Sequence, residues 1–130
     1  IVEGVPPWDE HTARHMLQTN VGRKHRTVVV RKRGKNSETE FKVLKRGQEQ
    51  ALLEAHPKTG RTHQIRVHLS ALGFPILGDT LYNASETDLI ARPALHAAKL
   101  TFSHPTSSKR VALTVHPPDD FLETLEHLKL

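Results

Sequence analysis

Apolar and polar residues alternate in a way that predicts several short strands in the first half of the chain. Residues 27–33 (TVVVRKR) combine β-branched side chains with flanking charge, which is typical of a strand. Residues 38–45 alternate between apolar and charged positions, and residues 50–56 supply a second run, so 38–56 is expected to form a hairpin. Residues 34–37 (GKNS) have the composition of a turn. We therefore expect antiparallel strands that carry charge at their turns and outer faces.

Residues 63–72 fit the period of a helix better than that of a strand. A strand would not separate polar from apolar side chains here, whereas a helix places the apolar residues at i, i+4 and i+7 from Ile65 on one stripe. Thr62 is a suitable N-cap, and Gly73 stands where a residue of left-handed conformation commonly ends a helix. The pattern predicts a central helix over 63–72.

The last part of the chain predicts two further strands and a terminal helix. Residues 94–104 and 110–116 have strand patterns and are joined by the turn-rich segment 105–109. Residues 117–120 (PPDD) are typical of a helix start, and an apolar stripe begins at Phe121. Together these elements predict one α+β domain that spans the whole chain, with a mainly antiparallel sheet, a central helix and a C-terminal helix.

Positive charge is concentrated in one segment of the chain. The 130 residues carry 19 Lys and Arg against 14 Asp and Glu, a net charge of +5. Residues 21–46 hold ten of these bases, Arg31, Lys32 and Arg33 among them, and two acids. Such a cluster attracts the phosphates of a nucleic acid, but Lys and Arg also protect exposed sheet edges from aggregation. Charge alone leaves both interpretations open.

Several classes of protein are excluded by composition. The chain has no Cys, which rules out a disulfide framework and a Cys-based zinc site. No apolar run approaches the roughly 20 residues that a membrane-spanning helix needs, and the N-terminus lacks the pattern of a signal peptide. We expect a cytoplasmic protein without a membrane partner. The start at Ile1 predicts a processed chain or a piece of a longer protein.

The densest group of chemically active residues is HPKTGRTHQIRVH, residues 56–68. If a helix begins near residue 63, Arg66 lies in its first turn, where the helix macrodipole disfavours a cation. Arg66 then requires an anion, either a carboxylate from elsewhere or a bound phosphate, unless water satisfies it. His63 and His68 are five residues apart with no Glu placed as a base, so no metal site is expected. Asp79 is expected to cap the turn that follows it.

Residues 56–82 closely resemble the signature of the RluA-type RNA pseudouridine synthases. The matching motifs are TGR, then HQ-apolar-RVH, then LG-x-PI-x-GD-x-x-Y, and the resemblance continues at Leu95–Ala97 and in PPDDF at 117–121. It implies a pseudouridine synthase-like fold and isomerisation of a uridine in rRNA or tRNA, without cofactor or metal. The target base must leave its stack for this chemistry, because its carbon cannot be reached inside a helix.

The resemblance also suggests roles for individual residues. Arg66 matches the arginine that pairs with the nucleophilic aspartate of the family, and Leu95 is expected beneath the target base. The expected RNA contacts are Lys58, Arg61, His63, Arg31, Lys32 and Arg33. For His63 and His68 a structural role competes with any contact to RNA.

One part of the family pattern does not occur in the sequence. The aspartate of the family lies in an HRLD-type motif, which this chain lacks, and its stacking Tyr is absent because the single Tyr is Tyr82. We therefore expect the C-terminal portion of a catalytic domain, inactive alone and completed by an N-terminal half. The competing hypotheses are a non-catalytic RNA-binding module of the same fold and an interaction domain that does not bind RNA.

Overall fold

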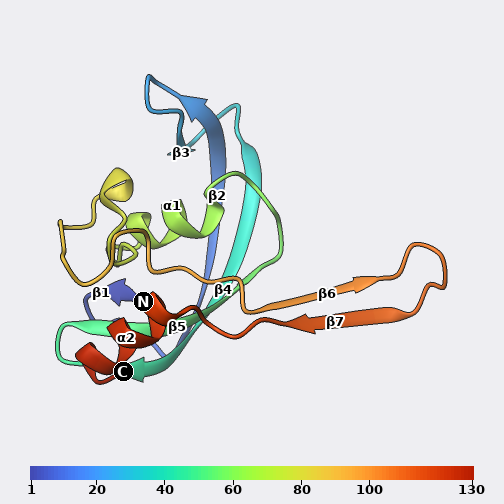
Figure 1. The fold of residues 1–130 in the computed structure, drawn as a ribbon. Coiled ribbons are helices and arrows are strands. Elements are labelled where there is room, and N and C mark those ends of the chain that lie inside the picture. The colour runs from blue at the N-terminus through green and yellow to red at the C-terminus, as the bar shows by residue number, and fades with distance from the viewer.

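The computed structural model describes residues 1–130 as an α+β fold built on a five-stranded antiparallel sheet (Figure 1). The strands follow the order β1-β5-β4-β2-β3 across the sheet, and a separate two-stranded hairpin is formed by β6 and β7. The α+β class expected from the sequence is confirmed. The elements are β1 Val2–Glu3, β2 Glu10–Val21, β3 Arg26–Val30, β4 Lys35–Arg46, β5 Gln50–Pro57, α1 Gln64–Ala71, η1 Thr80–Tyr82, β6 Lys99–Ser103, β7 Arg110–Thr114 and α2 Asp119–Leu128.

Strand β2 is the longest element that the hydrophobic pattern did not predict. It pairs with β3 on one side and with β4 on the other. Its fully buried side chains are Ala13 and Leu17, which lie four residues apart and are separated by Arg14, His15 and Met16. Apolar and polar residues therefore do not alternate along β2, and the period of a strand is not visible in its sequence.

The expected turn at 34–37 is wrong, whereas the hairpin over 38–56 is confirmed as β4 and β5. Residues 35–37 belong to β4, because the long strand β2 offers them backbone partners down to the pair Leu17 and Lys35. The turn lies earlier, so Arg31, Lys32 and Arg33 occupy the connection after β3 instead of a strand.

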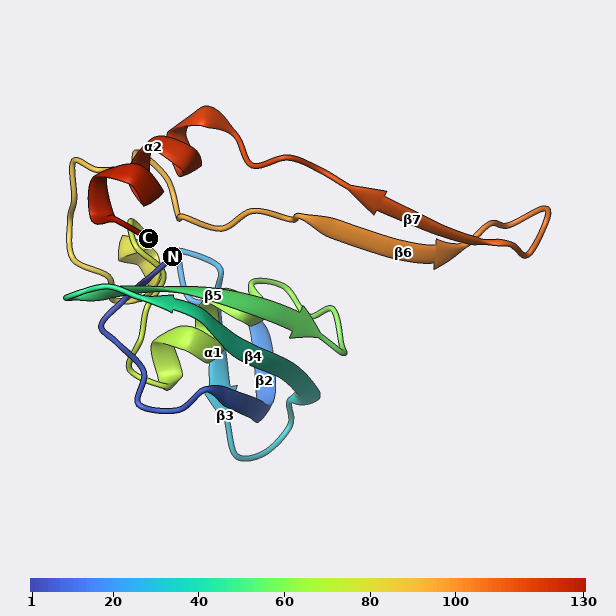
Figure 2. The ribbon, with the colours of Figure 1, turned by 90° about the horizontal axis from the view of Figure 1, so that it is seen from below.

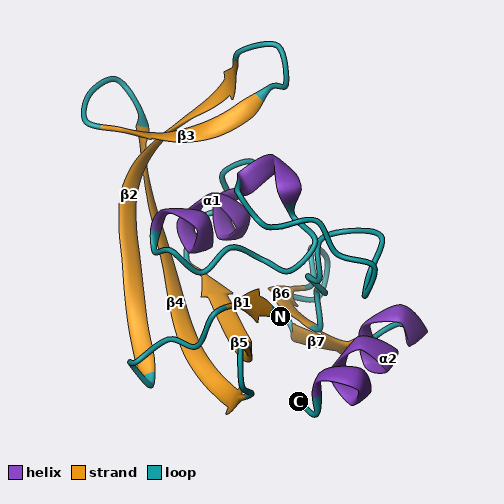
Figure 3. Cartoon of the chain, turned by 90° about the vertical axis from the view of Figure 1, so that its left-hand side faces the viewer, coloured by secondary structure: helices purple, strands orange, loops and turns teal.

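Helix α1 covers one face of the sheet (Figure 3) and agrees with the predicted helix to within one residue at each end. The proposed cap is wrong: His63 occupies the N-cap position in the left-handed conformation, and no side chain caps the helix. The carbonyl of Thr62 instead accepts a hydrogen bond from the Thr27 hydroxyl at 2.8 Å. Gly73 ends the helix with a positive φ of 89°, as the sequence indicates.

The core lies between the sheet, α1 and the segment that follows α1. Its largest cluster joins Phe41 of β4 to Leu69 of α1 and to Ile76 and Leu77 of that segment. The predicted terminal helix is confirmed as α2, whose Phe121 reaches the same cluster. Neither helix combines the length and apolar composition that crossing a membrane would require.

The predicted strands at 94–104 and 110–116 are confirmed in shorter form as β6 and β7. Figure 2 shows that this hairpin projects away from the rest of the molecule. Its apolar residues share one face, because Leu100 pairs with Leu113 and Phe102 pairs with Val111. Leu100 is 59% exposed and Leu113 is 48% exposed, so this face is uncovered in the chain.

Gly78 lies in a closely packed turn immediately before Asp79. Its φ is +82°, and a Cβ added there would lie 2.5 Å from the carbonyl oxygen of Arg92. Both the backbone conformation and the space therefore require glycine at this position.

Replacement of Gly78 by Ala is expected to lower the free energy of unfolding by about 2–4 kcal/mol, because a side chain must strain the backbone and displace Arg92. Urea denaturation followed by circular dichroism measures the change. Gly60→Ala is the matched control, since a Cβ there meets nothing within 4 Å. Equal stability of the two variants would contradict the steric explanation.

Candidate active site around Arg66

Arg66 and Asp79 form a bidentate ion pair at the centre of the candidate site. The Nε atom of Arg66 donates to Oδ2 of Asp79 at 2.7 Å, and Nη2 donates to Oδ1 at 2.7 Å. The Asp79 side chain is 1% exposed and that of Arg66 is 20% exposed. The hydrogen bonds to Asp79 raise the pKa of Arg66. Arg66 thus has the anionic partner that its place in the first turn of α1 demands.

The capping role expected for Asp79 is wrong, because no side-chain hydrogen bond caps η1. Both oxygens of its carboxylate accept hydrogen bonds from Arg66. The sequence contains one signal of this pairing: Asp79 stands within the apolar run PILGDTLY, where a carboxylate is buried and needs a cation.

The aromatic ring of Tyr82 packs against the guanidinium of Arg66. The guanidinium carbon of Arg66 lies 4.9 Å from the centre of the Tyr82 ring, and that of Arg26 lies 5.6 Å from it. Arg26 also donates to the Leu81 carbonyl. Two cations therefore share one aromatic ring, which favours both through cation–π attraction.

The hydroxyl of Tyr82 fixes the position of the His63 ring. It accepts the backbone N–H of Thr27 at 2.9 Å and is hydrogen-bonded to Nδ1 of His63 at 2.7 Å. Burial lowers the pKa of His63, and the charge of Arg66 lowers it further. These contacts give His63 a structural role, and its contact with RNA stays a prediction.

A shallow cavity of about 300 Å³ lies beside the ion pair. It brings together four of the predicted site residues, Arg61, His63, Arg66 and Leu95, the last of which is 37% exposed. Arg61 reaches away from the cavity through its Nε atom, which donates to the Asn36 carbonyl at 3.1 Å. The remaining lining residues are Pro57, Thr59, Gly60, Gln64 and Ile65.

The other predicted RNA contacts lie outside this cavity. Lys58 turns toward Glu40, 3.5 Å from its carboxylate. Arg31, Lys32 and Arg33 are exposed in the connection between β3 and β4. Since Asn36 is at the start of β4, the bond from Arg61 places that arginine beside the same connection.

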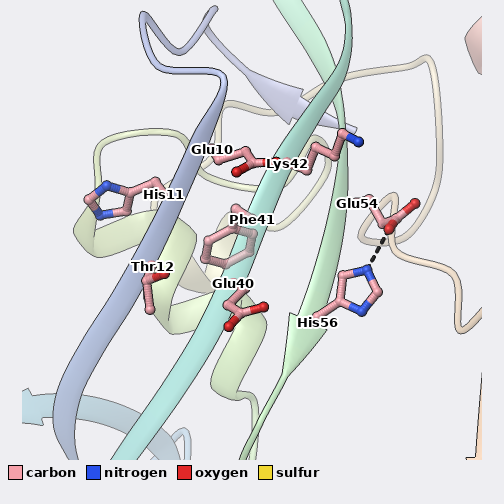
Figure 4. A pocket seen from close by; sticks show the side chains of 8 residues that line it. All are labelled: Glu10, His11, Thr12, Glu40, Phe41, Lys42, Glu54 and His56. Carbon is pink, nitrogen blue, oxygen red and sulfur yellow. Dashed lines mark hydrogen bonds and ion pairs between the residues drawn. The ribbon is translucent and has the colours of Figure 1, made fainter.

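A second hollow of about 410 Å³ lies on the outer face of the sheet (Figure 4). Three carboxylates line it, Glu10, Glu40 and Glu54, and a hydrogen bond from His56 lowers the pKa of Glu54. Lys42 also lines this hollow, but the three carboxylates leave the lining net negative, which disfavours a phosphate there. No group of three or more His, Cys, Asp or Glu side chains in the chain is placed to hold a metal ion.

His68, on the inner face of α1, is fully buried and hydrogen-bonded at both ring nitrogens. Nε2 lies 2.8 Å from the Ser37 hydroxyl, and Nδ1 lies 2.9 Å from the Thr39 hydroxyl. Burial lowers the pKa of His68 to about 4, with a smaller contribution from the nearby His15. The structural interpretation of His68 is therefore supported by its geometry.

Comparison with known proteins identifies the family to which this chain is related. Residues 2–71 match the family model described as RNA pseudouridylate synthase. The chain is 37% identical over 132 residues to the uncharacterized RNA pseudouridine synthase YlyB of Bacillus subtilis. The matched region covers 99% of this chain and 42% of that protein. It is 35% identical over 128 residues to the ribosomal large subunit pseudouridine synthase D of Zymomonas mobilis. The matched region covers 92% of this chain and 40% of that protein.

A solved structure agrees with these sequence relatives. Human RNA pseudouridylate synthase domain containing 1 superposes with a TM-score of 0.77 at 33% identity, over 98% of this chain and 55% of that one. The chain belongs to the RNA pseudouridylate synthase family and is of its RluA/RluD type. It spans about two fifths of the length of these two curated relatives.

Replacement of Asp79 by Asn is expected to destabilise the chain by about 2–3 kcal/mol, because it leaves the half-buried Arg66 without a counter-ion. Chemical denaturation at neutral pH measures the change. Asp88→Asn serves as the control, since Asp88 is exposed and makes no ion pair in the chain. A loss no larger than that of the control would show that the pair contributes little to stability.

Proposed function

We propose that this chain is the C-terminal portion of the catalytic domain of an RNA pseudouridine synthase that acts on rRNA or tRNA. The observation that carries the proposal is the place of Arg66, which is held rigidly at the edge of a cavity and matches the arginine of the family motif. In this proposal the nucleophilic aspartate and the stacking Tyr come from the part of the longer protein that precedes Ile1.

The geometry of Arg66 supports a second carboxylate beside it. Asp79 uses its Nε and Nη2 atoms, and Nη1 makes no hydrogen bond within the chain. A guanidinium has five N–H donors, so the edge formed by Nη1 and Nη2 can still bind an anion. An aspartate bound there would be favoured in its ionised form, as a nucleophile requires.

The chemistry proposed for the completed site is an isomerisation. The bond between C1′ of the ribose and N1 of the uracil breaks, the base rotates, and a bond from C1′ to C5 replaces it. One proton leaves C5 and one is bound at N1, so no atom is gained or lost overall. The aspartate from the preceding segment would act at the sugar or the base, and Arg66 would hold its carboxylate in place.

Two further features support a segment packed against this chain. The amino group of Ile1 donates to the Ala94 carbonyl at 2.9 Å, and burial lowers its pKa to about 5. A backbone amide N–H, which never carries a charge, would make the same bond without a shift in pKa. Ala94 leads directly into the β6 hairpin, whose apolar face is uncovered, and two-stranded hairpins alone are marginally stable. We propose that the preceding part of the domain covers that face.

The longer protein, expressed with the segment that precedes Ile1, is expected to convert uridine to pseudouridine in rRNA or tRNA, while residues 1–130 alone do not. Arg66→Ala in the longer protein should lower the rate by about 100-fold or more, since a fixed charge at the reacting centre is lost. Mass spectrometry of digested RNA measures conversion, and hydrogen exchange shows whether β6 and β7 become protected.

Arg14→Ala is the control for this experiment, because Arg14 is an exposed arginine on β2 that pairs with Glu38 and does not line the cavity. Its activity should equal that of the parent. An inactive parent, or an Arg66→Ala variant as active as the control, would overturn the catalytic role.

The second candidate function is a non-catalytic RNA-binding module. It is favoured by the exposed bases of residues 31–33, which lie beside Arg61 and belong to no ion pair in the chain. This hypothesis expects RNA affinity from residues 1–130 alone and no conversion by the longer protein.

If residues 31–33 contact phosphates, replacing all three by Gln should weaken RNA binding and reduce the slope of log K against log salt by about 2, at about 0.7 per contact for single strands. Fluorescence anisotropy with a labelled RNA at several salt concentrations measures both. The matched control replaces Lys99, Lys109 and Arg110 by Gln, three exposed bases of the other hairpin. An equal change in the two triple variants would show only a general charge effect.

A further inference from the structure

A chain of buried side-chain hydrogen bonds connects the loop before α1 to the interior of the sheet. It begins at Gln64, the first residue of α1, which is 4% exposed. This glutamine lies at the back of the candidate site and belongs neither to the ion pair nor to the predicted RNA contacts.

The amide of Gln64 uses every hydrogen-bonding position that it has. Its Oε1 accepts from the Thr59 hydroxyl at 2.6 Å and from the Arg61 backbone N–H at 3.1 Å. Its Nε2 donates to the Glu38 carbonyl at 2.9 Å and to the Thr39 hydroxyl at 2.9 Å. A backbone N–H can only donate and a carbonyl can only accept, so the orientation of the amide is determined by its partners.

The chain continues from Thr39 through the core. The Ser37 hydroxyl donates to the His15 carbonyl at 2.7 Å, so it must accept from Nε2 of His68, and the neutral ring carries its proton on that nitrogen. The opposite nitrogen, Nδ1, then accepts from the Thr39 hydroxyl, which itself accepts from Gln64. Each group donates in one direction only, and hydrogen bonds aligned in this way strengthen one another.

This chain fixes the loop that the RNA contacts occupy. Besides the two bonds from Gln64, Thr59 accepts the Glu38 backbone N–H at 3.0 Å, and the Lys58 N–H donates to the Glu38 carbonyl at 2.9 Å. The Gln64 side chain joins this loop to the first turn of α1, and its backbone N–H donates to the Arg61 carbonyl at 3.0 Å. Loss of the side chain would remove one hydrogen bond from Thr59 and the bond of the Arg61 N–H, while the bonds of the loop to Glu38 remain.

We propose that Gln64, supported from behind by Thr39 and His68, is a positioning residue that holds the 58–61 loop so that Arg61 is presented to the RNA. The proposal rests on the proposed function in that the ligand is RNA. The geometric part concerns the loop alone, and it can be tested without RNA.

Hydrogen exchange followed by NMR on residues 1–130 tests the geometric part. In Gln64→Met, the Arg61 amide should exchange at least about fivefold faster, which is the equilibrium effect of one neutral hydrogen bond. The Leu72 amide, bonded to the His68 carbonyl at the far end of α1, should keep its protection. Gln18→Met is the matched control, because Gln18 is exposed on β2. Unchanged exchange at Arg61 in Gln64→Met would overturn the proposal.

Thr39→Val provides a second variant that should fold even if Gln64→Met does not, because valine has the shape of threonine and suits a strand. It removes one support behind Gln64 and leaves the bonds to the loop. Exchange at Arg61 should then be faster than in the parent but slower than in Gln64→Met. A Thr39→Val variant indistinguishable from the parent would show that the chain of bonds behind Gln64 has no effect on the loop.

A double-mutant cycle on RNA affinity tests the functional part. Gln64→Met should weaken binding about fivefold in the parent and by less than twofold in an Arg61→Gln background, because Gln64 acts through Arg61. Equal effects in both backgrounds would overturn the link to Arg61. Absence of RNA binding by the parent would count against the proposed function, while the exchange experiment would still decide whether Gln64 holds the loop.

Discussion

The buried carboxylate of Asp79 is the constraint around which the candidate site is arranged. An ionised group with almost no exposure is costly to desolvate unless a cation with good geometry faces it, and Arg66 supplies that cation from α1. The pair ties α1 to the segment that follows it, and the ring of Tyr82 lies under the same guanidinium. Gly78 then has to turn tightly, because Asp79 must enter the interior directly after the core residues Ile76 and Leu77.

Helix α1 meets the sheet through polar groups as well as apolar ones. Val67 and Leu69 are buried beside Gln64 and His68, and the polar pair finds its partners on β4. Apolar contacts have no direction, whereas each of these hydrogen bonds accepts one geometry. The helix is therefore held in register against β4, and this register places its half-buried residues Ile65 and Arg66 at the edge of the cavity.

The sequence allowed the helix over 63–72, the hairpin over 38–56 and the α+β class to be predicted, because each has a period or a turn that is visible locally. Strand β2 could not be predicted, since its partners and not its own pattern decide what it buries. The need of Arg66 for an anion was predictable from the helix macrodipole, but the identity of that anion was not. Asp79 meets Arg66 through tertiary folding, and no spacing in the sequence shows it.

The assignment of roles at the site depends on both kinds of information. The family motif identified Arg66 and the cavity residue Leu95, and the charge count located the basic segment that lies beside Arg61. Gln64 and Tyr82 both stand in the family motif, but no role was predicted for either, because a motif does not show which partners a side chain meets. Their importance follows from the partners that surround them, which the folded chain alone supplies.

The guanidinium of Arg66 gives the edge of the cavity a single hydrogen-bonding polarity. An arginine side chain has donors and no acceptor, and Nη1 of Arg66 makes no hydrogen bond in the chain. A molecule bound against this edge therefore meets N–H groups. The edge selects by complementarity for ligands rich in acceptor oxygens, and an ammonium or another donor group would find no partner in Arg66.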